Sequence, residues 1–204
     1  MAELQTKAPL DWYLRSTQMI DVDHEEIHRF ISSCNYEGKD EINIIRDTFE
    51  FVRDQVSHSY DVKGHRVTAK ASEALLDREG ICYAKSHLLA ALLRGMGIPT
   101  GVCYQKLTLG DTPDTGYCIH ALNTVYLAPQ DRWIRLDARG NKPGVDAQFS
   151  LSEEKLAFDV RPHYGEIDYL TNHYDAHPQI VQTLENHKES DALEMYLYHL
   201  PTDL

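Results

Sequence analysis

A glycine turn leads directly into an apolar helix in the stretch Arg78-Glu79-Gly80-Ile81-Cys82-Tyr83-Ala84-Lys85-Ser86-His87-Leu88-Leu89-Ala90-Ala91-Leu92-Leu93. Gly95, Gly97 and Pro99 supply the signals that end this helix. Because apolar residues occupy most of its faces, we expect the helix to be buried at the centre of the fold. The sequence therefore places Cys82 at the first turn of a central helix.

The start of a helix favours a reactive thiol. Its unpaired N–H groups and the positive end of its dipole stabilise a thiolate, and such positions lower the pKa of a cysteine from about 8.5 to roughly 3.5–7.5. The same N–H groups could hold the oxyanion that forms when a thiolate attacks a carbonyl. Taken alone, the stretch also allows Cys82 to be a small core residue, as most free cysteines are. Lys85 is interpreted as a solvated or substrate-side cation.

Strands follow this helix along the chain. Residues Gly101 to Leu109 are rich in strand-forming residues, and Gly110 to Gly116 read as a loop. Two further runs, Tyr117 to Leu127 and Arg132 to Asp137, are joined by Ala128-Pro129-Gln130-Asp131 and predict an antiparallel hairpin.

The hairpin register brings a histidine and an aspartate together. If Leu127 faces Arg132, then Leu122 stands opposite Asp137, and His120 projects from the same face as the diagonal neighbour of Asp137. Diagonal neighbours lie roughly 7–8 Å apart, a gap that an imidazole and a carboxylate can bridge. This prediction holds provided that no bulge shifts the register.

Cys82, His120 and Asp137 together provide the three parts of an activated-thiol site. The imidazole would take the thiol proton, and the carboxylate would fix the tautomer of the imidazole and support its charged form. Each residue also has an ordinary interpretation, since His120 could be a core histidine and Asp137 a strand end. Their convergence in chain order favours the catalytic interpretation.

Several segments resemble the core of the transglutaminase-like superfamily. They are Gly80-Ile81-Cys82-Tyr83-Ala84-Lys85-Ser86, Gly97-Ile98-Pro99, His120-Ala121-Leu122-Asn123-Thr124-Val125-Tyr126 and Trp133-Ile134-Arg135-Leu136-Asp137, with Phe51-Val52-Arg53-Asp54 and Ser59-Tyr60-Asp61 as a lead-in. The resemblance covers roughly residues 42 to 140. It implies papain-type thiol chemistry, with Cys82 as nucleophile, His120 as general base and acid, and Asp137 as the carboxylate that orients the histidine.

The resemblance leaves the pocket wall and the second oxyanion donor open. Many relatives have an aromatic residue two positions after the histidine, where this chain has Leu122. Gln105, on the strand before the histidine strand, is a candidate oxyanion or substrate-binding residue, and its alternative interpretation is an exposed strand residue. His58 and Tyr60 are weaker candidates.

The remaining segments complete an α+β fold. The sequence predicts helices over residues 23–31, 42–56 and 71–76 before the cysteine helix. Beyond Gly140 it predicts a short helix over 155–158, which Ser150 and Glu153 would cap, and helices over 178–186 and 191–199. The prediction is a single transglutaminase-like, papain-like domain over 1–204 with a helical N-terminal part, a central cysteine helix packed on an antiparallel sheet (core about 42–140), and a C-terminal helical extension (about 150–204).

Composition limits partners and location. Of the 204 residues, 20 are basic and 32 acidic, and the resulting formal charge of −12 disfavours nucleic acid and anionic membranes. The four cysteines show no regular spacing and no signal peptide is visible, so reduced thiols and a cytoplasmic location are expected. No cofactor is expected, and the sequence specifies no oligomeric state.

Histidines near the C-terminus raise the alternative of a metal site. His173 and His177 have the spacing of a helical zinc pair, and Asp168 and Asp175 could complete it. Pro178 follows at once, and no glutamate lies between the two histidines as in HExxH, so this interpretation is disfavoured.

The expected function is that of a cysteine-dependent acyl-transfer enzyme acting on a peptide or another amide. A peptidase or amidase that transfers the acyl group to water ranks first because water is the simplest acceptor. Acyl transfer to an amine, as in a protein-glutamine transglutaminase, uses the same residues. A non-catalytic binding module that keeps the fold is the alternative from a different class.

Overall fold

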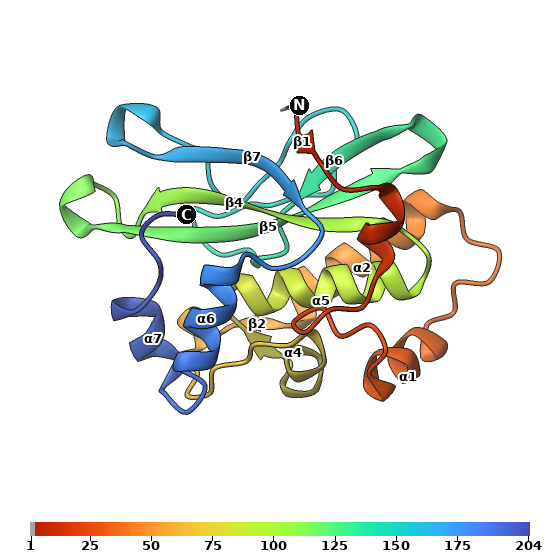
Figure 1. Cartoon of the computed structure of the whole chain (residues 1–204), viewed down its shortest axis with the longest axis horizontal. Helices are drawn as coiled ribbons and strands as arrows, with labels where there is room; N and C mark the ends of the chain where they lie inside the picture. Colours follow the sequence, from red (N-terminus) through yellow and green to blue (C-terminus); the bar gives the residue numbers. More distant parts are fainter. Residues whose placement is uncertain (1–2) are drawn as a thin grey trace.

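The computed structural model describes residues 3–204 and contains a five-stranded sheet with helices gathered along one side of it (Figure 1). The strand order is β1-β7-β4-β5-β6, and the strands are β1 (Gln5–Thr6), β4 (Thr100–Thr108), β5 (Tyr117–Leu127), β6 (Arg132–Leu136) and β7 (Ile167–His173). All neighbours are antiparallel except the short parallel pair of β1 and β7. The expected α+β class with an antiparallel sheet is confirmed.

The helices form the second layer of the fold. They are α1 (Glu25–Ser33), α2 (Glu41–Gln55), α3 (Ser59–Val62), α4 (Ala71–Asp77), α5 (Cys82–Gly95), α6 (Pro178–Asn186) and α7 (Ala192–Tyr198). Helix α5 runs along the sheet and packs against α1, α2, α4, β4 and β5. Because neighbours surround it, all residues from Cys82 to Arg94 are buried, which confirms the predicted central helix. None of the described helices has the length and apolar character needed to cross a membrane.

A second, two-stranded sheet lies before α5. Strand β2 (Ser57–His58) pairs in parallel with β3 (Glu79–Gly80), and His58 stands opposite Gly80. Gly80 has no room for a side chain, because an added Cβ would lie 2.9 Å from both Ala84 Cβ and Thr68 Oγ1. The glycine turn expected before the helix is thus the end of strand β3, and the chain enters α5 at Cys82, two residues after Gly80.

The predicted hairpin register is confirmed. Leu127 pairs with Arg132 and Asn123 with Leu136, so no bulge separates the turn from the end of β6. A short 3₁₀ turn over Ala128–Gln130 closes the hairpin, and Asp131 follows it in the left-handed region with φ of +48°.

The C-terminal third differs from the prediction in two ways. Residues 155–158 form no helix, although Ser150 Oγ accepts the N–H group of Glu153 (3.3 Å) as a helix cap would. The N–H group of Ala157 instead donates a hydrogen bond to the Asp137 carboxylate (3.0 Å), and this long-range bond replaces a helical one.

The second difference is that β7 lies within the segment predicted to be a helical extension. The sequence did not predict this strand because it contains polar residues such as Asp168 and Asn172. These side chains bind residues that are distant along the chain. Asp168 pairs with Arg135 on β6 (2.6 Å), and the Asn172 side chain accepts a hydrogen bond from Thr124 on β5 (2.6 Å). The two helices predicted over 178–186 and 191–199 are present as α6 and α7.

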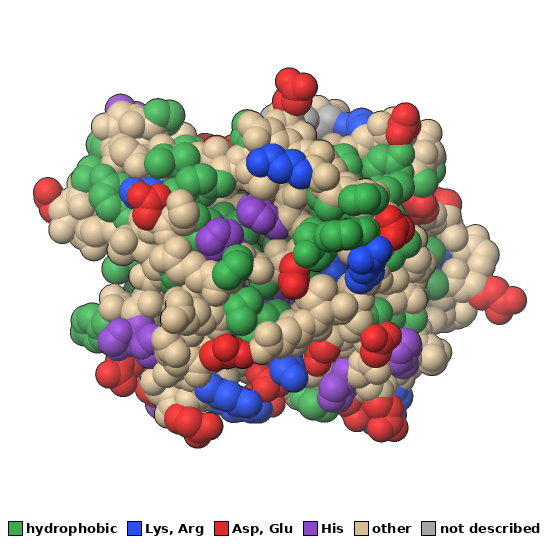
Figure 2. Space-filling view, in the orientation of Figure 1, with side chains coloured by type: hydrophobic (Ala, Val, Ile, Leu, Met, Phe, Trp, Pro, Cys, Tyr) green, Lys and Arg blue, Asp and Glu red, His purple; other side chains and the backbone are tan. Residues whose placement is uncertain are grey.

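The surface carries mixed charge on the face shown in Figure 2. Acidic, basic and histidine side chains are scattered there among apolar and neutral polar groups.

Candidate active site

Cys82 is the first residue of α5 and is 3% exposed. The residue before it, Ile81, is the N-cap and provides no side-chain cap. The first hydrogen bond of the helix runs from the Lys85 N–H group to the Ile81 carbonyl (3.1 Å). The N–H group of Cys82 therefore precedes the helical ladder and is available to a ligand at the helix start.

Two hydrogen bonds fix α5 against the strand that carries His120. The Tyr83 hydroxyl donates to the carbonyl of Ile119 (2.7 Å), the residue before His120. One turn further on, the Asn123 side chain donates to the Ser86 carbonyl (2.9 Å). Because both bonds are buried, the thiol and the imidazole are held in a fixed relation.

His120 and Asp137 form a buried pair, with His120 Nε2 lying 2.8 Å from Asp137 Oδ2. Asp137 also accepts the backbone N–H groups of Arg139 (3.1 Å) and Ala157 (3.0 Å). The ring of Phe158 meets the His120 ring edge to face, with centroids 5.2 Å apart. These contacts hold both the carboxylate and the imidazole in place.

The charges of this pair favour an imidazolium. Burial alone would lower the pKa of His120, but the negative charge of Asp137 and its hydrogen bond, aided by Cys82, raise it to about 10. Burial raises the pKa of Asp137, and the charge and hydrogen bond of His120 outweigh this, so that the pKa falls below its usual range. Because Nε2 is bonded to Asp137, Nδ1 is the ring nitrogen left for the sulfur.

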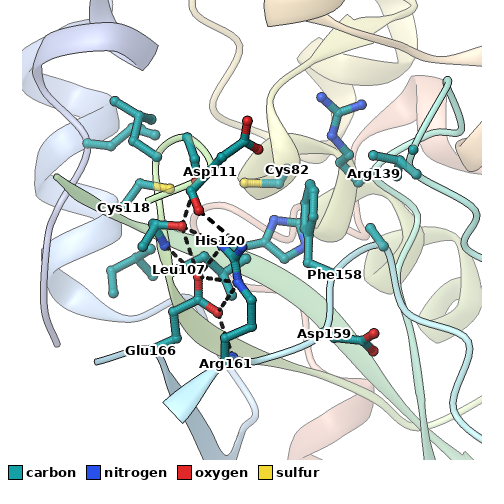
Figure 3. A pocket seen from close by; sticks show the side chains of 18 of the residues that line it. Cys82, Leu107, Asp111, Cys118, His120, Arg139, Phe158, Asp159, Arg161 and Glu166 are labelled. Atoms are coloured by element: carbon teal, nitrogen blue, oxygen red, sulfur yellow. Dashed lines mark hydrogen bonds and ion pairs between the residues drawn. The ribbon is translucent and has the colours of Figure 1, made fainter. Parts of the chain in front are cut away.

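The sulfur and the imidazole line one cavity of about 510 Å³. Figure 3 shows the side chains of Cys82, His120 and Phe158 together at its centre. Other walls come from the β4–β5 hairpin, from residues 143–145 and 157–161, and from Tyr196 on α7. The C-terminal segment therefore forms part of the cavity wall.

Two ion pairs brace the cavity wall. Arg161 pairs with Glu166 (2.7 Å), and Glu166 also accepts the N–H group of Thr108 on β4 (3.0 Å) (Figure 3). Arg139 donates to Asp61 through Nη2 (3.0 Å). The sequence marked only Asp61, as part of a segment that resembles the superfamily, and it predicted neither ion pair because the partners lie far apart along the chain or in an irregular loop.

The interpretation of Lys85 as a solvated or substrate-side cation is wrong. Its side chain is 0% exposed, and Nζ donates to the backbone carbonyls of Val56 and Arg53, the latter at 3.3 Å. Burial lowers the pKa of Lys85 to about 7. The residue joins α5 to the end of α2 rather than facing the cavity.

Gln105 lies opposite His120 in the pairing of β4 with β5. It is buried, so its alternative interpretation as an exposed strand residue is wrong. Gln105 is nevertheless absent from the described residues that line the cavity, and its Oε1 atom has no partner among them. Its role as an oxyanion donor remains a prediction without support from this placement.

The histidines of the disfavoured metal site lie together on β7 and before α6. The rings of His173 and His177 have centroids 5.7 Å apart. Asp168 is engaged by Arg135 (2.6 Å), and Asp175 accepts a hydrogen bond from Thr17 (2.6 Å). Within residues 3–204, no group of three or more metal-ligating side chains is arranged to hold an ion.

Comparison with known proteins identifies the family. The model of the transglutaminase-like superfamily matches residues 32–138, a segment that includes Cys82, His120 and Asp137. The chain belongs to this superfamily. No curated protein sequence matches it significantly.

Solved structures show more distant similarity. A protein described as a proposed cysteine protease from Cytophaga hutchinsonii is 20% identical, with 64% of this chain and 42% of that chain covered and a TM-score of 0.45. The periplasmic domain of TgpA from Pseudomonas aeruginosa is 18% identical, with 63% and 46% covered and a TM-score of 0.47. Red sea bream transglutaminase is 12% identical, with 62% and 27% covered and a TM-score of 0.40. The alignments span less than half the length of each of these three chains.

Proposed function

We propose that the protein is a cysteine-dependent acyl-transfer enzyme that cleaves an amide bond through a thioacyl intermediate. The observation that carries this proposal is that Cys82 and His120 line the same cavity, while His120 is bonded to the buried Asp137. A helix-start sulfur next to an imidazolium has the surroundings of a nucleophilic thiolate.

The geometry supports a reaction in two halves. The Cys82 sulfur attacks the carbonyl carbon, a C–S bond forms, and the carbonyl electron pair moves to oxygen. When the oxyanion collapses, the C–N bond breaks, and His120 gives its proton to the departing amine. Water then attacks the thioester while His120 takes a proton from it, and the C–S bond breaks to release the acid and the thiolate.

Asp137 acts through His120. Its carboxylate accepts a hydrogen bond from the Nε2–H group, keeps Nδ1 directed at the sulfur, and stabilises the positive charge of the ring. The backbone N–H groups of Arg139 and Ala157 donate hydrogen bonds to the Asp137 carboxylate and hold it in this orientation.

An activated ester tests the proposal without knowledge of the natural amide. Mixing the protein with p-nitrophenyl acetate should release a burst of about one p-nitrophenol per chain, with an acetyl group found on Cys82 by mass spectrometry. Cys82→Ala and His120→Ala should abolish the burst, whereas the matched control Cys34→Ala should keep it. A burst that persists in Cys82→Ala, or a wild-type chain that shows none, would contradict the proposal and favour a binding module.

The acceptor is then tested on the acyl-enzyme. Addition of a primary amine to the acetylated protein should leave the rate of deacylation unchanged if water is the acceptor. Acceleration of deacylation with formation of the acetylated amine would instead favour the transglutaminase-type reaction.

A further inference from the structure

A second histidine lines the cavity beside the nucleophile. The pairing of β2 with β3 places His58 opposite Gly80, two residues before Cys82. His58 and Cys82 are both among the residues that line the same cavity, and His58 is 4% exposed. The reaction described above gives His58 no role.

The protonation of the His58 ring follows from its hydrogen bond. Its Nδ1 atom accepts the backbone N–H group of Tyr60 (3.3 Å), so the ring proton of the neutral imidazole lies on Nε2. Within residues 3–204, Nε2 has no hydrogen-bond partner, although the side chain is almost wholly buried. The ring also meets Tyr196 edge to face at 5.7 Å, which restrains its rotation.

The surroundings keep this ring neutral. Burial lowers the pKa of His58 well below its usual value. The charges of Arg139, Lys85 and His120 act in the same direction, and only that of Asp61 opposes them. At neutral pH the ring is therefore a fixed neutral N–H donor and cannot compete with His120 for the thiol proton.

We propose that His58 donates its Nε2–H to the oxyanion that forms when Cys82 attacks the substrate carbonyl, together with the Cys82 backbone N–H. The inference rests on the proposed function and adds a catalytic residue to it. A tetrahedral oxyanion needs preorganised donors, and loss of one such donor slows acyl transfer by about 10²–10³-fold. The donor assigned here lies on β2, which pairs with β3, the strand that precedes the nucleophile.

Two reactions of the same sulfur separate this role from a structural one. Acylation by p-nitrophenyl acetate passes through an oxyanion, whereas alkylation by iodoacetamide is a displacement at carbon and forms none. His58→Phe keeps a ring but removes the donor, and we expect acylation to slow by about 10²–10³-fold while alkylation of Cys82 keeps its wild-type rate. His58→Gln retains an N–H donor and should recover part of the acylation rate.

Each outcome has a defined meaning. Unchanged acylation in His58→Phe, or an equal loss of rate in both reactions, would overturn the role of His58. The proposed function would still stand if the wild-type protein shows the p-nitrophenol burst. Absence of a burst in the wild-type protein would overturn both.

A measurement on the unmutated protein covers the case in which His58→Phe fails to fold. Acetaldehyde forms a hemithioacetal whose oxygen should accept the His58 Nε2–H, and so shift its proton resonance downfield. A resonance that does not move would also overturn the role.

Discussion

His120 and Asp137 are in contact across the hairpin, with a distance of 2.8 Å between Nε2 and Oδ2, although the strand register makes them diagonal neighbours rather than a directly opposed pair. Asp137 lies one residue beyond the end of β6, where the backbone is free to turn. The N–H groups of Arg139 and Ala157 bind its carboxylate and direct it at the imidazole. A loop far along the chain thereby completes a pair that the hairpin brings near.

Replacement of Asp137 by asparagine should slow acylation of Cys82 by about 10²–10⁴-fold, the range that general acid–base catalysis contributes. An amide carries no negative charge, so the pKa of His120 should fall from about 10 toward its ordinary value. The rate is measured from the p-nitrophenol burst, and the pKa by NMR titration of the ring. The matched control is Asp114→Asn, an exposed carboxylate outside the cavity lining. Full activity in Asp137→Asn would contradict the assignment.

Iodoacetamide should label Cys82 in preference to the other buried thiols near pH 7. Burial raises the pKa of Cys103 and of Cys118 to about 12, so that both remain protonated thiols. Cys82 lies beside an imidazolium, and His120→Ala should therefore slow its labelling. Peptide mapping by mass spectrometry gives the rate at each site, and half-buried Cys34 provides an internal reference. Labelling of Cys118 as fast as Cys82 would contradict this account.

The hairpin and the central helix could be predicted because their signals are local. An alternating pattern with a short turn fixes which residues of β5 and β6 are opposite, and the glycine turn with an apolar run fixes the start of α5 at Cys82. The prediction that His120 and Asp137 meet required only the register of β5 with β6.

Other parts of the site depend on contacts that no local pattern records. The Ala157 N–H group reaches Asp137 from a loop where a helix was predicted, and Tyr196 reaches the cavity from α7. Strand β2 has only two residues, too few for a period to be seen, so the sequence predicted His58 only as a weaker oxyanion candidate than Gln105. Lysine is typical of protein surfaces, but Lys85 is buried because backbone carbonyls at the end of α2 accept hydrogen bonds from its ammonium group.

Truncation of Leu88 to alanine should destabilise the fold by about 2–5 kcal/mol, because the side chain is 0% exposed in α5 and its removal leaves a cavity in the main hydrophobic core. The matched control is Leu76→Ala in α4, where the side chain is 57% exposed and the change should stay within about 0.5 kcal/mol. Urea unfolding followed by circular dichroism measures both. Equal effects at the two sites would contradict the central position of α5.

The free energy of unfolding should be greatest near neutral pH and should fall on both sides, because two sets of groups titrate in opposite directions. Burial lowers the pKa of His58 and of His87, so their contribution is present above about pH 6.5 and is lost as the pH falls. Burial raises the pKa of Glu166, but Arg161 and the N–H group of Thr108 outweigh it and bring the value to about 2, which adds a loss below about pH 4.5.

His120 adds a loss on the alkaline side. Cys103 and Cys118, whose pKa burial raises to about 12, act in the same direction, and Lys85, whose pKa burial lowers to about 7, acts against them. The pKa of His120 in the folded protein is about 10, above its value in the unfolded chain, so its contribution is complete below about pH 6.5 and is lost as the pH rises through about 10. Urea unfolding at a series of pH values measures the profile. His120→Gln should make the alkaline limb less steep than in the wild type and leave the acid limb in place, whereas His58→Gln should make only the acid limb less steep. An alkaline limb as steep in His120→Gln as in the wild type would show that His120 is not held as an imidazolium by Asp137.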